Sequence, residues 1–446
     1  MTKINDFNGT RLRCIRCGYE TSLLKERDFQ CECGGLYDVV HELEPNSFEH
    51  LTGVFDERAM MSYRASNDPK ITSGVWRFKE LIMPGLDDSE IVTLGEGNYP
   101  IVPFGKNLKE WIGGDLDGWL VLEGVGPTNS FKDNGGTVLI SVAKKTGVKL
   151  IGAPSTGDTS AMVAAYASIA GMVCCVVLPD GQITPVQITQ PLVHGSKVIL
   201  LPANFDICKD NFFAIAKTGL IDFASSKNPT RIEGHQSTVF RIAQHFGWAL
   251  PDAIVFPVGN GSNGSSIGKA QRTLQAIGYK GRISRLVGAQ SHAACPLAKS
   301  FLTFEYASEY PTIKEWEEQY NPMEVGETAA TAARIGDPVS YLKILREIIF
   351  SDGCMDFANE EDLMEAVAIC GKDGRFICPQ SGTALAVLKK RVEKGTIAPG
   401  SRVCVICTAD GIKFCDAAVK SLLPTVVKAK DASVETLEAL MKKLLT

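Results

Sequence analysis

Short apolar runs and longer helical patterns alternate along most of this chain, and this alternation constrains its fold more than any other feature. Six runs, rich in β-branched and small apolar residues, have the length and composition of buried strands. They are KLIGAP, VCCVVLP, SKVILLPA, AIVFPVG, SRLVGAQ and RVCVICT. Helical patterns occupy residues 133–146, 159–171, 184–194, 205–217, 233–247 and 264–278. Repeated βα units predict an α/β fold of mostly parallel sheet with helices on both faces.

The order of these units divides the chain into two lobes of mostly parallel sheet. Its 446 residues are enough for two or three domains with a sizeable core. We expect a small α/β domain over residues 149–225 and a large domain built from residues 41–148 and 226–425. Residues 1–40 form a separate cysteine-rich segment, and residues 426–446 form a C-terminal helix.

Two segments stand outside the alternation. The segment from Phe304 to Asp337 mixes charged and aromatic residues, which indicates either an insertion or a mobile lid. The C-terminal VETLEALMKKLLT is amphipathic. Its apolar face carries Leu437, Leu440, Leu444 and Leu445. This pattern predicts a helix that packs on the body, and the alternative is a helix that binds a partner.

Composition excludes several classes of function. A net charge of −5 and a pI near 5.8 argue against a nucleic-acid partner, which needs a basic face. No apolar run reaches about 18 residues, so no membrane span is expected, and the N-terminus lacks a signal-peptide core. Most of the 14 cysteines stand singly in apolar segments, which is typical of reduced core thiols. These features predict a cytoplasmic enzyme.

Four cysteines near the N-terminus form a CxxC pair followed by a CxC pair. They are Cys14, Cys17, Cys31 and Cys33. Four thiolates in two close pairs can surround a zinc ion tetrahedrally and leave no open coordination site. The second pair has one intervening residue instead of the usual two, so four unconnected thiols remain the alternative. The segment is therefore predicted to be a zinc ribbon with a structural role.

A glycine-rich turn follows the apolar strand that ends at Val258. It reads Gly259-Asn260-Gly261-Ser262-Asn263-Gly264 and opens a helix. Glycines let backbone N–H groups converge on an oxyanion, and the helix N-terminus favours negative charge. The glycine spacing matches neither the dinucleotide fingerprint nor a Walker loop. The turn is either a phosphate cradle or a plain tight turn.

Two other polar segments also follow predicted strands. Ser155-Thr156-Gly157-Asp158-Thr159 opens an alanine-rich helix and is either an ordinary N-cap or a grip on an anion. Thr408 stands at the end of RVCVIC. Ligands of doubly wound sheets bind at such strand ends, although a single threonine there is usually only a cap.

A lone lysine, Lys132, lies in the turn-forming stretch GPTNSFKDNGG before an apolar helix. A lysine amine attacks an aldehyde when its pKa is lowered. A phosphorylated aldehyde cofactor needs such an amine, a phosphate cradle, a flat pocket and a partner for its ring nitrogen. Lys132, Gly259–Gly264, Asp158 and Thr408 supply one feature each, and this combination fits pyridoxal phosphate.

Seven ordered stretches resemble one family, the threonine synthases, which are pyridoxal-phosphate enzymes of the tryptophan-synthase-β fold (fold type II). The stretches are TLGEGNYP, GPTNSFKDNGG, STGDTSA, NPTRIEGHQS, VGNGSN, ARIGDPVS and ICPQSGTALA. The resemblance runs from RCIRCG to about residue 425, and the CxxC…CxCGG start occurs in many members. SGVWRFKELIMP resembles the plant-type branch most closely.

The resemblance implies roles for the matching residues. Lys132 would hold the cofactor as a Schiff base and act as the main acid and base, with Phe131 beside it. Asp158 would lie near the cofactor's 3-hydroxyl, and Thr408 would hydrogen-bond the pyridine nitrogen. The residues that would hold the cofactor phosphate are Gly259, Asn260, Gly261, Ser262 and Asn263. The residues that would bind the substrate are Ser155, Thr156, Thr159 and Arg231, with Arg231 on its phosphate.

The implied reaction converts O-phospho-L-homoserine and water into L-threonine and phosphate, by γ-elimination followed by β-addition of water. The alternative is a related lyase or β-replacement enzyme that acts on O-phosphoserine, resembling cysteate synthase, or a serine/threonine dehydratase-like enzyme. A non-catalytic binding protein is a third hypothesis. Family members are commonly dimers, so a homodimer is expected.

Several positions depart from the family pattern. They are Tyr99, Asn129, Asn134, Ser225, Gly261, Gln380 and Asp410. Tyr99 is expected to fill space at the pocket rim, and Asn129 takes a glycine position although asparagine tolerates the left-handed conformation best after glycine. An unpaired Asp410 near the pocket would disfavour a phosphorylated substrate. These departures indicate either drift with activity retained or a changed substrate.

Overall fold

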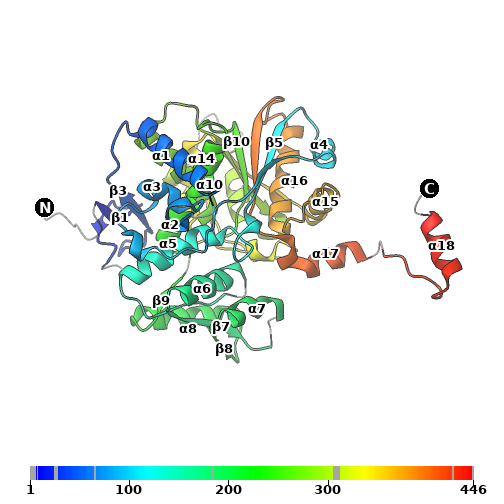
Figure 1. Ribbon diagram of the computed structural model, residues 1–446, viewed down its shortest axis with the longest axis horizontal. Coiled ribbons are helices and arrows are strands. Elements are labelled where there is room, and N and C mark those ends of the chain that lie inside the picture. The colour runs from blue at the N-terminus through cyan, green and yellow to red at the C-terminus, as the bar shows by residue number, and fades with distance from the viewer. Residues whose placement is uncertain are drawn as a thin grey trace.

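The computed structural model describes residues 7, 9–24, 29–64, 67–155, 157–181, 185–224, 226–304, 312–423 and 426–443. A large body occupies the centre of the molecule, and a smaller lobe lies beneath it (Figure 1). A small antiparallel sheet lies at the N-terminal side, and the C-terminal helices extend away from the opposite side.

The large body is built on a six-stranded sheet in the order β12-β11-β10-β13-β5-β4. Its strands are β4 (Ile101–Pro103), β5 (Asp117–Leu122), β10 (Ala253–Pro257), β11 (Arg285–Ser291), β12 (Cys354–Ala358) and β13 (Arg402–Cys407). All neighbours run parallel except β4, which pairs antiparallel with β5. Every residue of β10 is buried, as expected for a central parallel strand covered on both faces.

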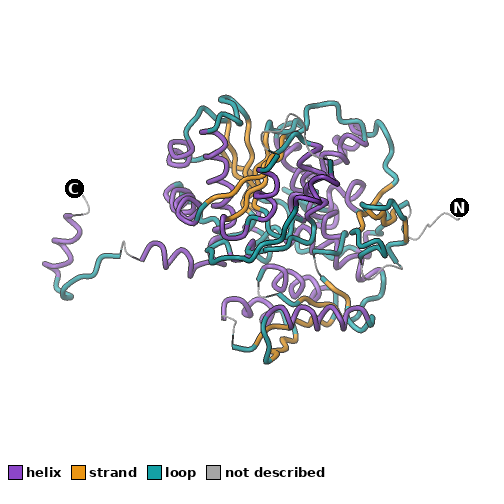
Figure 2. Tube along the Cα trace, turned by 180° about the vertical axis from the view of Figure 1, so that it is seen from behind, coloured by secondary structure: helices purple, strands orange, loops and turns teal. Residues whose placement is uncertain are grey.

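Helices cover the six-stranded sheet on its two faces, as seen from behind in Figure 2. They include α1 (Phe48–Met61), α2 (Pro69–Thr72), α3 (Lys79–Ile82), α4 (Lys106–Ile112), α5 (Lys132–Lys145), α9 (Thr230–His235), α10 (Ser237–His245), α11 (Ser262–Ala276), α12 (Pro296–Leu302), α13 (Ile313–Gln319), α14 (Tyr341–Phe350), α15 (Glu360–Lys372) and α16 (Pro379–Glu393). Helix α16 packs against β10, β11, β12 and β13, whereas α11 and α14 pack against each other and against β11.

The smaller lobe holds a four-stranded parallel sheet in the order β8-β7-β6-β9. Its strands are β6 (Leu150–Ala153), β7 (Val173–Pro179), β8 (Lys197–Leu201) and β9 (Asp222–Phe223). Its helices are α6 (Asp158–Ile169), α7 (Pro185–Val193) and α8 (Phe205–Lys217). The apolar face of α6 and the strands form a core separate from that of the large body.

The N-terminal sheet is antiparallel, with the order β2-β1-β3. Its strands are β1 (Thr10–Cys14), β2 (Glu20–Thr21) and β3 (Tyr37–His41). The turn between β1 and β2 carries the first cysteine pair, and the segment before β3 carries the second. The two pairs therefore meet at one end of this sheet.

The α/β prediction is confirmed, because all six predicted strands form and all lie in parallel pairings. The helix predicted over residues 233–247 is instead two helices, α9 and α10, which meet at Gln236. In the two larger sheets, β4, β5, β9 and β12 were not among the six predicted strands. Strand β4 has three residues, one of them a proline, and β9 has two, so neither carries an apolar run of strand length.

The polar segment from Phe304 to Asp337 is in part an insertion that packs on the body. The indole of Trp316 in α13 is buried and stacks near Tyr320 and Tyr341, with ring centroids of the two tyrosines 4.5 Å apart. Residues 305–311 lie outside the described residues.

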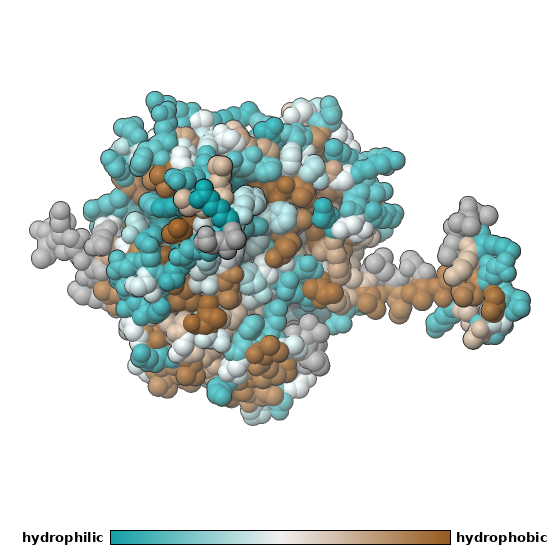
Figure 3. Space-filling view, in the orientation of Figure 1, coloured by the Kyte–Doolittle hydropathy of each residue, from teal (hydrophilic) through white to brown (hydrophobic). Residues whose placement is uncertain are grey.

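The C-terminal helix forms as α18 (Val434–Lys443), preceded by α17 (Cys415–Leu422). Figure 1 shows α18 separated from the body, and Leu437 is 53% exposed, so the expectation that it packs on its own chain is wrong. Figure 3 shows an apolar surface along the segment that leads to it. Leu444 and Leu445 lie outside the described residues. No helix in the described part of the chain is long and apolar enough to cross a membrane.

Candidate active site

Three neighbouring strands deliver the predicted chemical groups to one edge of the large sheet. Strands β10, β13 and β5 are parallel neighbours, so their carboxyl ends share that edge. The glycine-rich turn follows β10, Thr408 follows β13, and the turn that contains Lys132 follows β5. This is the edge at which open α/β sheets bind ligands.

The turn before Lys132 is fixed by backbone hydrogen bonds to the end of β13. The N–H of Phe131 donates to the carbonyl of Thr408 at 2.8 Å, and the N–H of Asp410 donates to the carbonyl of Asn129 at 3.1 Å. Asn129 adopts φ +60°, so this departure from glycine keeps the left-handed conformation. Lys132 is the first residue of α5, and the residue before it is thereby tied to Thr408.

The amine of Lys132 lies in a desolvated, mixed-charge environment. Desolvation by burial lowers its pKa to about 8, the Asp158 carboxylate opposes that shift, and the Arg231 and Lys413 cations add to it. Its Nζ lies 4.3 Å from the centroid of the Phe131 ring. A lysine with such a pKa has a substantial neutral fraction near pH 8, as nucleophilic attack on an aldehyde requires.

The glycine-rich turn has the geometry of an anion cradle. Gly261 adopts φ +85° and precedes α11, whose first residue is Ser262, and no side chain caps this helix. The first N–H groups of a helix have no intrahelical partner. The side-chain nitrogen Nδ2 of Asn263 is also buried and has no hydrogen-bond partner among the described residues. These donors can converge on a phosphate.

Asp158 lies at the start of α6 and forms an ion pair with the large body. Its carboxylate contacts Nζ of Lys413 at 2.8 Å, and Lys413 also donates to the carbonyl of Thr128 at 2.8 Å. Both residues line a cleft of about 1080 Å³ between α6 and α7 on one side and α15 and α17 on the other. Asn129 also lines it, which places the mouth of the site between the two lobes.

The hydroxyl of Thr408 lies among other buried polar groups. Its Oγ1 is 3.7 Å from Sγ of Cys378, and its N–H donates to Oγ of Ser381 at 3.0 Å. Burial raises the pKa of the Cys378 thiol, so this thiol stays protonated and neutral. The side chains in contact with Thr408, the Cys378 thiol and the Ser381 hydroxyl, are therefore neutral, which suits a neutral hydrogen-bond partner for a ring nitrogen.

Arg231 in α9 is buried, with 2% of its surface exposed, and forms no ion pair with the described residues. Among the described residues its Nε has no hydrogen-bond partner, and burial lowers its pKa to about 10. Near it, the ring of His235 lies 4.9 Å from that of Phe131, and burial first and then Arg231 hold the pKa of His235 well below its usual range. An unpaired buried guanidinium indicates a site for an anion.

The remaining predicted substrate residues lie at the start of α6. Ser155 and Thr159 are partly exposed there, and Oγ of Ser155 accepts a hydrogen bond from the N–H of Gly157 at 3.3 Å. Thr156 lies outside the described residues. Among the described residues, this helix start therefore offers hydroxyl groups beside Asp158.

Two of the departures from the family pattern are partners. The hydroxyl of Tyr99 is buried and donates to Oδ1 of Asn134 at 3.0 Å, so the expectation that Tyr99 fills the pocket rim is wrong. The amide of Asn134 donates in turn to Glu123 at 3.1 Å. The two substitutions therefore satisfy each other's polar atoms inside the core.

Among the other departures, Asp410 caps the turn that follows it, because its Oδ1 accepts the N–H of Ile412 at 2.8 Å, and it forms no ion pair with the described residues. The side-chain nitrogen and oxygen of Gln380 are buried and have no hydrogen-bond partner among the described residues. Ser225 lies outside the described residues.

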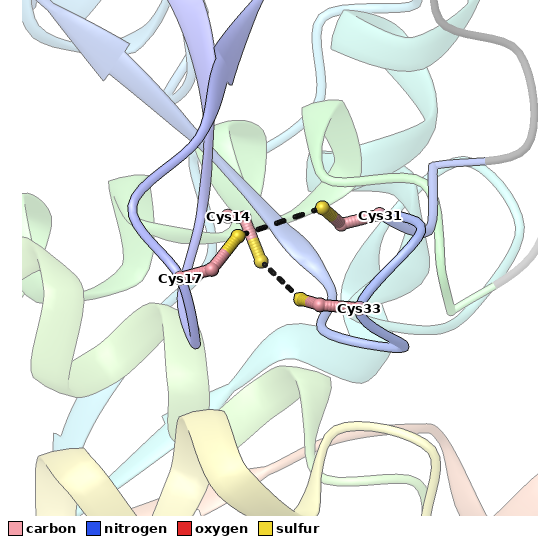
Figure 4. A group of neighbouring side chains, drawn as sticks. All are labelled: Cys14, Cys17, Cys31 and Cys33. Carbon is pink, nitrogen blue, oxygen red and sulfur yellow. Dashed lines mark hydrogen bonds between the residues drawn. The ribbon is translucent and has the colours of Figure 1, made fainter.

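The four N-terminal cysteines lie far from this cleft and form a cluster of their own (Figure 4). Their sulfur atoms all lie within 4.8 Å of one another. Sγ of Cys14 is 3.5 Å from that of Cys33, and Sγ of Cys17 is 3.7 Å from that of Cys31. All four are free thiols with the proximity that a tetrahedral metal site needs.

Comparison with known proteins assigns this site to a family. Residues 92–409 match the family model described as pyridoxal-phosphate dependent enzyme. A threonine synthase of Methanocaldococcus jannaschii is 34% identical over 92% of this chain and 94% of that protein. The chain belongs to the threonine synthase family. Another family member, threonine synthase 2 (chloroplastic) of Arabidopsis thaliana, is 35% identical over 89% of this chain and 75% of that protein.

Solved structures agree on the fold of this threonine synthase family member. The threonine synthase of Escherichia coli superposes with a TM-score of 0.66 and covers 96% of this chain and 94% of its own, at 16% identity. The chain thus has the fold of the type II pyridoxal-phosphate enzymes, and its cofactor is pyridoxal phosphate.

Sequence reasoning missed three residues of the site: Lys413, Cys378 and His235. Lys413 follows Thr408 by five positions, and this spacing was its only signal. Cys378 and His235 lie in two of the family-like stretches, ICPQSGTALA and NPTRIEGHQS, but no role was predicted for them, and only the fold brings them to Thr408 and Phe131.

Proposed function

We propose that this protein is a threonine synthase, which converts O-phospho-L-homoserine and water into L-threonine and phosphate. The observation that carries the proposal is the Arg231 guanidinium, which is buried, lacks an ion pair among the described residues and influences the pKa of Lys132. A buried cation without a carboxylate is stabilised by an anion from outside the protein. The substrate's phosphate group supplies that anion near the reactive amine.

The residues around Lys132 fit pyridoxal phosphate. The left-handed Gly261 and the unpartnered amide of Asn263 suit a phosphate group, which Gly259, Asn260 and Ser262 would help to hold. Nζ of Lys132 would hold the aldehyde carbon and the Thr408 hydroxyl the ring nitrogen, while Phe131 and Asp158 flank the group. Bound there, pyridoxal phosphate supplies a conjugated system that stabilises negative charge on a substrate carbon.

The chain's own residues would then move protons and hold the substrate. Nζ of Lys132 would take a proton from the α-carbon and then one from the β-carbon, and its lowered pKa leaves it neutral for this task near pH 8. Arg231 would hold the phosphate before and after it leaves. The hydroxyls of Ser155, Thr156 and Thr159 would bind the amino-acid end of the substrate.

An assay with two substrates tests this proposal. We expect the purified protein to release threonine and phosphate in equal amounts from O-phospho-L-homoserine, and to act poorly on O-phospho-L-serine. Lys132→Ala should reduce the rate by about 10²-fold or more, because it removes the proton-transferring group. A cofactor-loaded protein that forms no threonine at any pH would show that the substrate has changed, and turnover of O-phospho-L-serine would then favour a β-replacement enzyme.

We further propose that the protein works in the cytoplasm as a homodimer. Its isolated buried cysteines support a reducing compartment, and the exposed apolar side chains of the C-terminal arm support association. We also propose that Cys14, Cys17, Cys31 and Cys33 bind structural zinc. The proposed domains are the ribbon over 1–40, the large domain over 41–148 and 226–425, the small domain over 149–225, and the C-terminal helix over 426–446.

A further inference from the structure

We propose that a zinc ion at the four-cysteine cluster anchors the cofactor's phosphate turn by fixing the N-terminus of α14. The cluster thus acts on cofactor retention from outside the cleft. This inference rests on the placement of the cofactor phosphate at Gly259–Asn263 proposed above. Two sets of contacts join the cluster to α14, and a third joins α14 to that turn.

The chemistry of the cluster favours zinc over a catalytic metal. Its four sulfur atoms are mutually within 4.8 Å, and four thiolates complete a tetrahedral shell with no position left for a substrate. The turns that carry them are tight: the N–H of Gly34 donates to the carbonyl of Cys31 at 2.7 Å. A Cβ atom on Gly35 would lie 2.6 Å from Sγ of Cys14, so the cluster packs directly on this glycine.

The first set of contacts starts between two of the ligands. Arg16, which lies between Cys14 and Cys17 in the chain, contacts Oε1 of Glu317 at 2.6 Å and donates to the hydroxyl of Tyr341 at 3.0 Å. Tyr341 is the first residue of α14. A metal that fixes the turn between the two cysteines therefore also fixes the position of the Arg16 guanidinium on α14.

The second set of contacts comes from β3. Nζ of Lys343 in α14 donates to the carbonyl of Tyr37 at 2.5 Å and pairs with Asp38 at 3.0 Å. Arg346 pairs with the same carboxylate at 2.8 Å. Tyr37 lies directly opposite Cys14 in the β1–β3 ladder. The contacts of α14 with β3 therefore also depend on the end of the sheet at which the cysteines lie.

The N-terminus of α14 in turn supports the phosphate turn. The N–H of Ser340 donates to the carbonyl of Asn260 at 2.9 Å. A Cβ atom on Gly261 would lie 3.3 Å from the carbonyl oxygen of Ser340, and one on Gly264 would lie 2.6 Å from the side chain of Ile344. The turn and α14 are thus packed without a gap, and a shift of α14 would displace the N–H groups that face the phosphate.

Loss of the ion should loosen this arrangement without unfolding the large body. The ribbon contributes Leu12, Tyr37 and Val39 to the core cluster of that body, but most members of the cluster come from the six-stranded sheet and its helices. The ribbon is a small sheet, and small sheets with little core of their own depend on metal ligation for their order. Coupling between two sites of one protein is reciprocal: if zinc strengthens cofactor binding, the cofactor must strengthen zinc binding by the same factor.

The first experiment measures both directions of this coupling on the full-length protein. We expect one zinc per chain by elemental analysis. Stripping it with a chelator should raise the dissociation constant for pyridoxal phosphate about tenfold, within the usual range for coupled sites, and added zinc should restore it. In return, bound pyridoxal phosphate should lower the dissociation constant for zinc, measured by competition with a chelator, by the same factor. Neither readout requires threonine formation, so failure of the proposed activity would leave this test intact.

A matched pair of surface variants separates the anchor from general loss of the ribbon. Arg16→Ala removes the contact with α14, whereas Arg13→Ala removes an ion pair with Glu20 that stays inside the ribbon. The two arginine side chains are 38% and 48% exposed, so neither substitution opens a core. Arg16→Ala should weaken pyridoxal phosphate binding about two- to fivefold with zinc still bound, and Arg13→Ala should leave it unchanged. Absence of bound zinc, cofactor affinity that is the same with and without it, or equal effects of the two variants would each overturn the proposal.

Discussion

At position 132 an amine lies against a phenyl ring and between charges of opposite sign, and this environment decides its reactivity. Burial lowers the pKa of Lys132 to about 8, Asp158 works in the opposite direction, and Arg231 works in the same direction as burial. Lys132, Asp158 and Arg231 come from three different helices, so the pKa of Lys132 depends on the folded arrangement of all three.

The first prediction concerns the pH dependence of cofactor attachment. Only the neutral amine attacks an aldehyde, so the rate at which apoprotein takes up pyridoxal phosphate should rise with pH and level off above about 8. Asp158→Asn removes a charge that raises the pKa and should move the midpoint to lower pH. Arg231→Gln removes a charge that lowers it and should move the midpoint to higher pH. Stopped-flow absorbance measures each profile, and a wild-type midpoint near 10.5 would contradict a desolvated lysine.

A second prediction at this scale concerns the pair of departures Tyr99 and Asn134. Tyr99→Phe leaves Oδ1 of Asn134 buried without its donor, which should lower the free energy of unfolding by about 1–2 kcal/mol. The control is Tyr63→Phe, because that side chain is 92% exposed and its loss should change little. Urea titration followed by fluorescence compares them, and equal stabilities would mean that the hydrogen bond contributes nothing.

At the scale of elements, the start of α11 is the proposed cradle for the cofactor phosphate. The turn needs a left-handed residue at Gly261 so that the following N–H groups point to one place. Its neighbours Ser340 and Ile344 leave little room for a side chain. Backbone geometry and packing therefore both require glycine at position 261.

Gly261→Ala is the third prediction. An alanine there adopts a strained backbone at about 1–2 kcal/mol and places Cβ against Ser340, so the dissociation constant for pyridoxal phosphate should rise about tenfold. Gly219→Ala is a matched control, since Gly219 has φ +80° with open space around it and lies in the small lobe. Both variants carry the same backbone strain. Absorbance titration that gave both the same cofactor affinity would mean that Gly261 does not face the cofactor.

The elements differed in how well the sequence predicted them. Strands such as β7 and β10 are continuous apolar runs, and burial on both faces is what produces such runs in a parallel sheet. Edge strand β4 has only partly buried and exposed residues, so its sequence carries no comparable pattern. The break between α9 and α10 has no proline or exposed glycine to mark it and follows from tertiary packing.

The site shows the same division. Lys132 and the turn at Gly261 stand in local sequence patterns with a direct chemical meaning, so they could be singled out before the structure. The ion pair of Asp158 with Lys413 joins residues 255 positions apart, and periodicity and composition give no information on such a pairing. Family resemblance implied the role of Arg231, whereas its burial and the lack of a hydrogen-bond partner for its Nε among the described residues became visible only in the folded chain.

For the whole molecule, one ion pair joins the two lobes across the cleft between them. The Asp158–Lys413 pair is nearly buried and links α6 of the small lobe to the end of β13 in the large body. Separating such a pair leaves a charge without its partner. The pair therefore stabilises the present placement of the two lobes at the cleft where the substrate is proposed to enter. Opening and closing of this cleft would therefore change the charge environment of Lys132 as well.

The last prediction concerns the C-terminal arm, which leaves the body on the side opposite the ribbon (Figures 1 and 3). The arm exposes large apolar side chains, each between 53% and 76% accessible. They are Leu423, Val426, Val427, Val434, Leu437 and Met441. Proteins rarely leave such a run of apolar side chains in water, so a second copy of the chain is expected to cover it.

The full-length protein should sediment as a dimer, and removal of residues 426–446 should shift it toward monomer. A double substitution, Leu437→Asp with Met441→Asp, should weaken the dimer without shortening the chain, because it places charge in an apolar contact. Lys442→Ala is the control, since it changes an exposed charge that already pairs with Glu438 inside the helix. Sedimentation velocity that found a monomeric full-length chain at micromolar concentration, or an unchanged dimer after the truncation, would show that the arm does not mediate self-association.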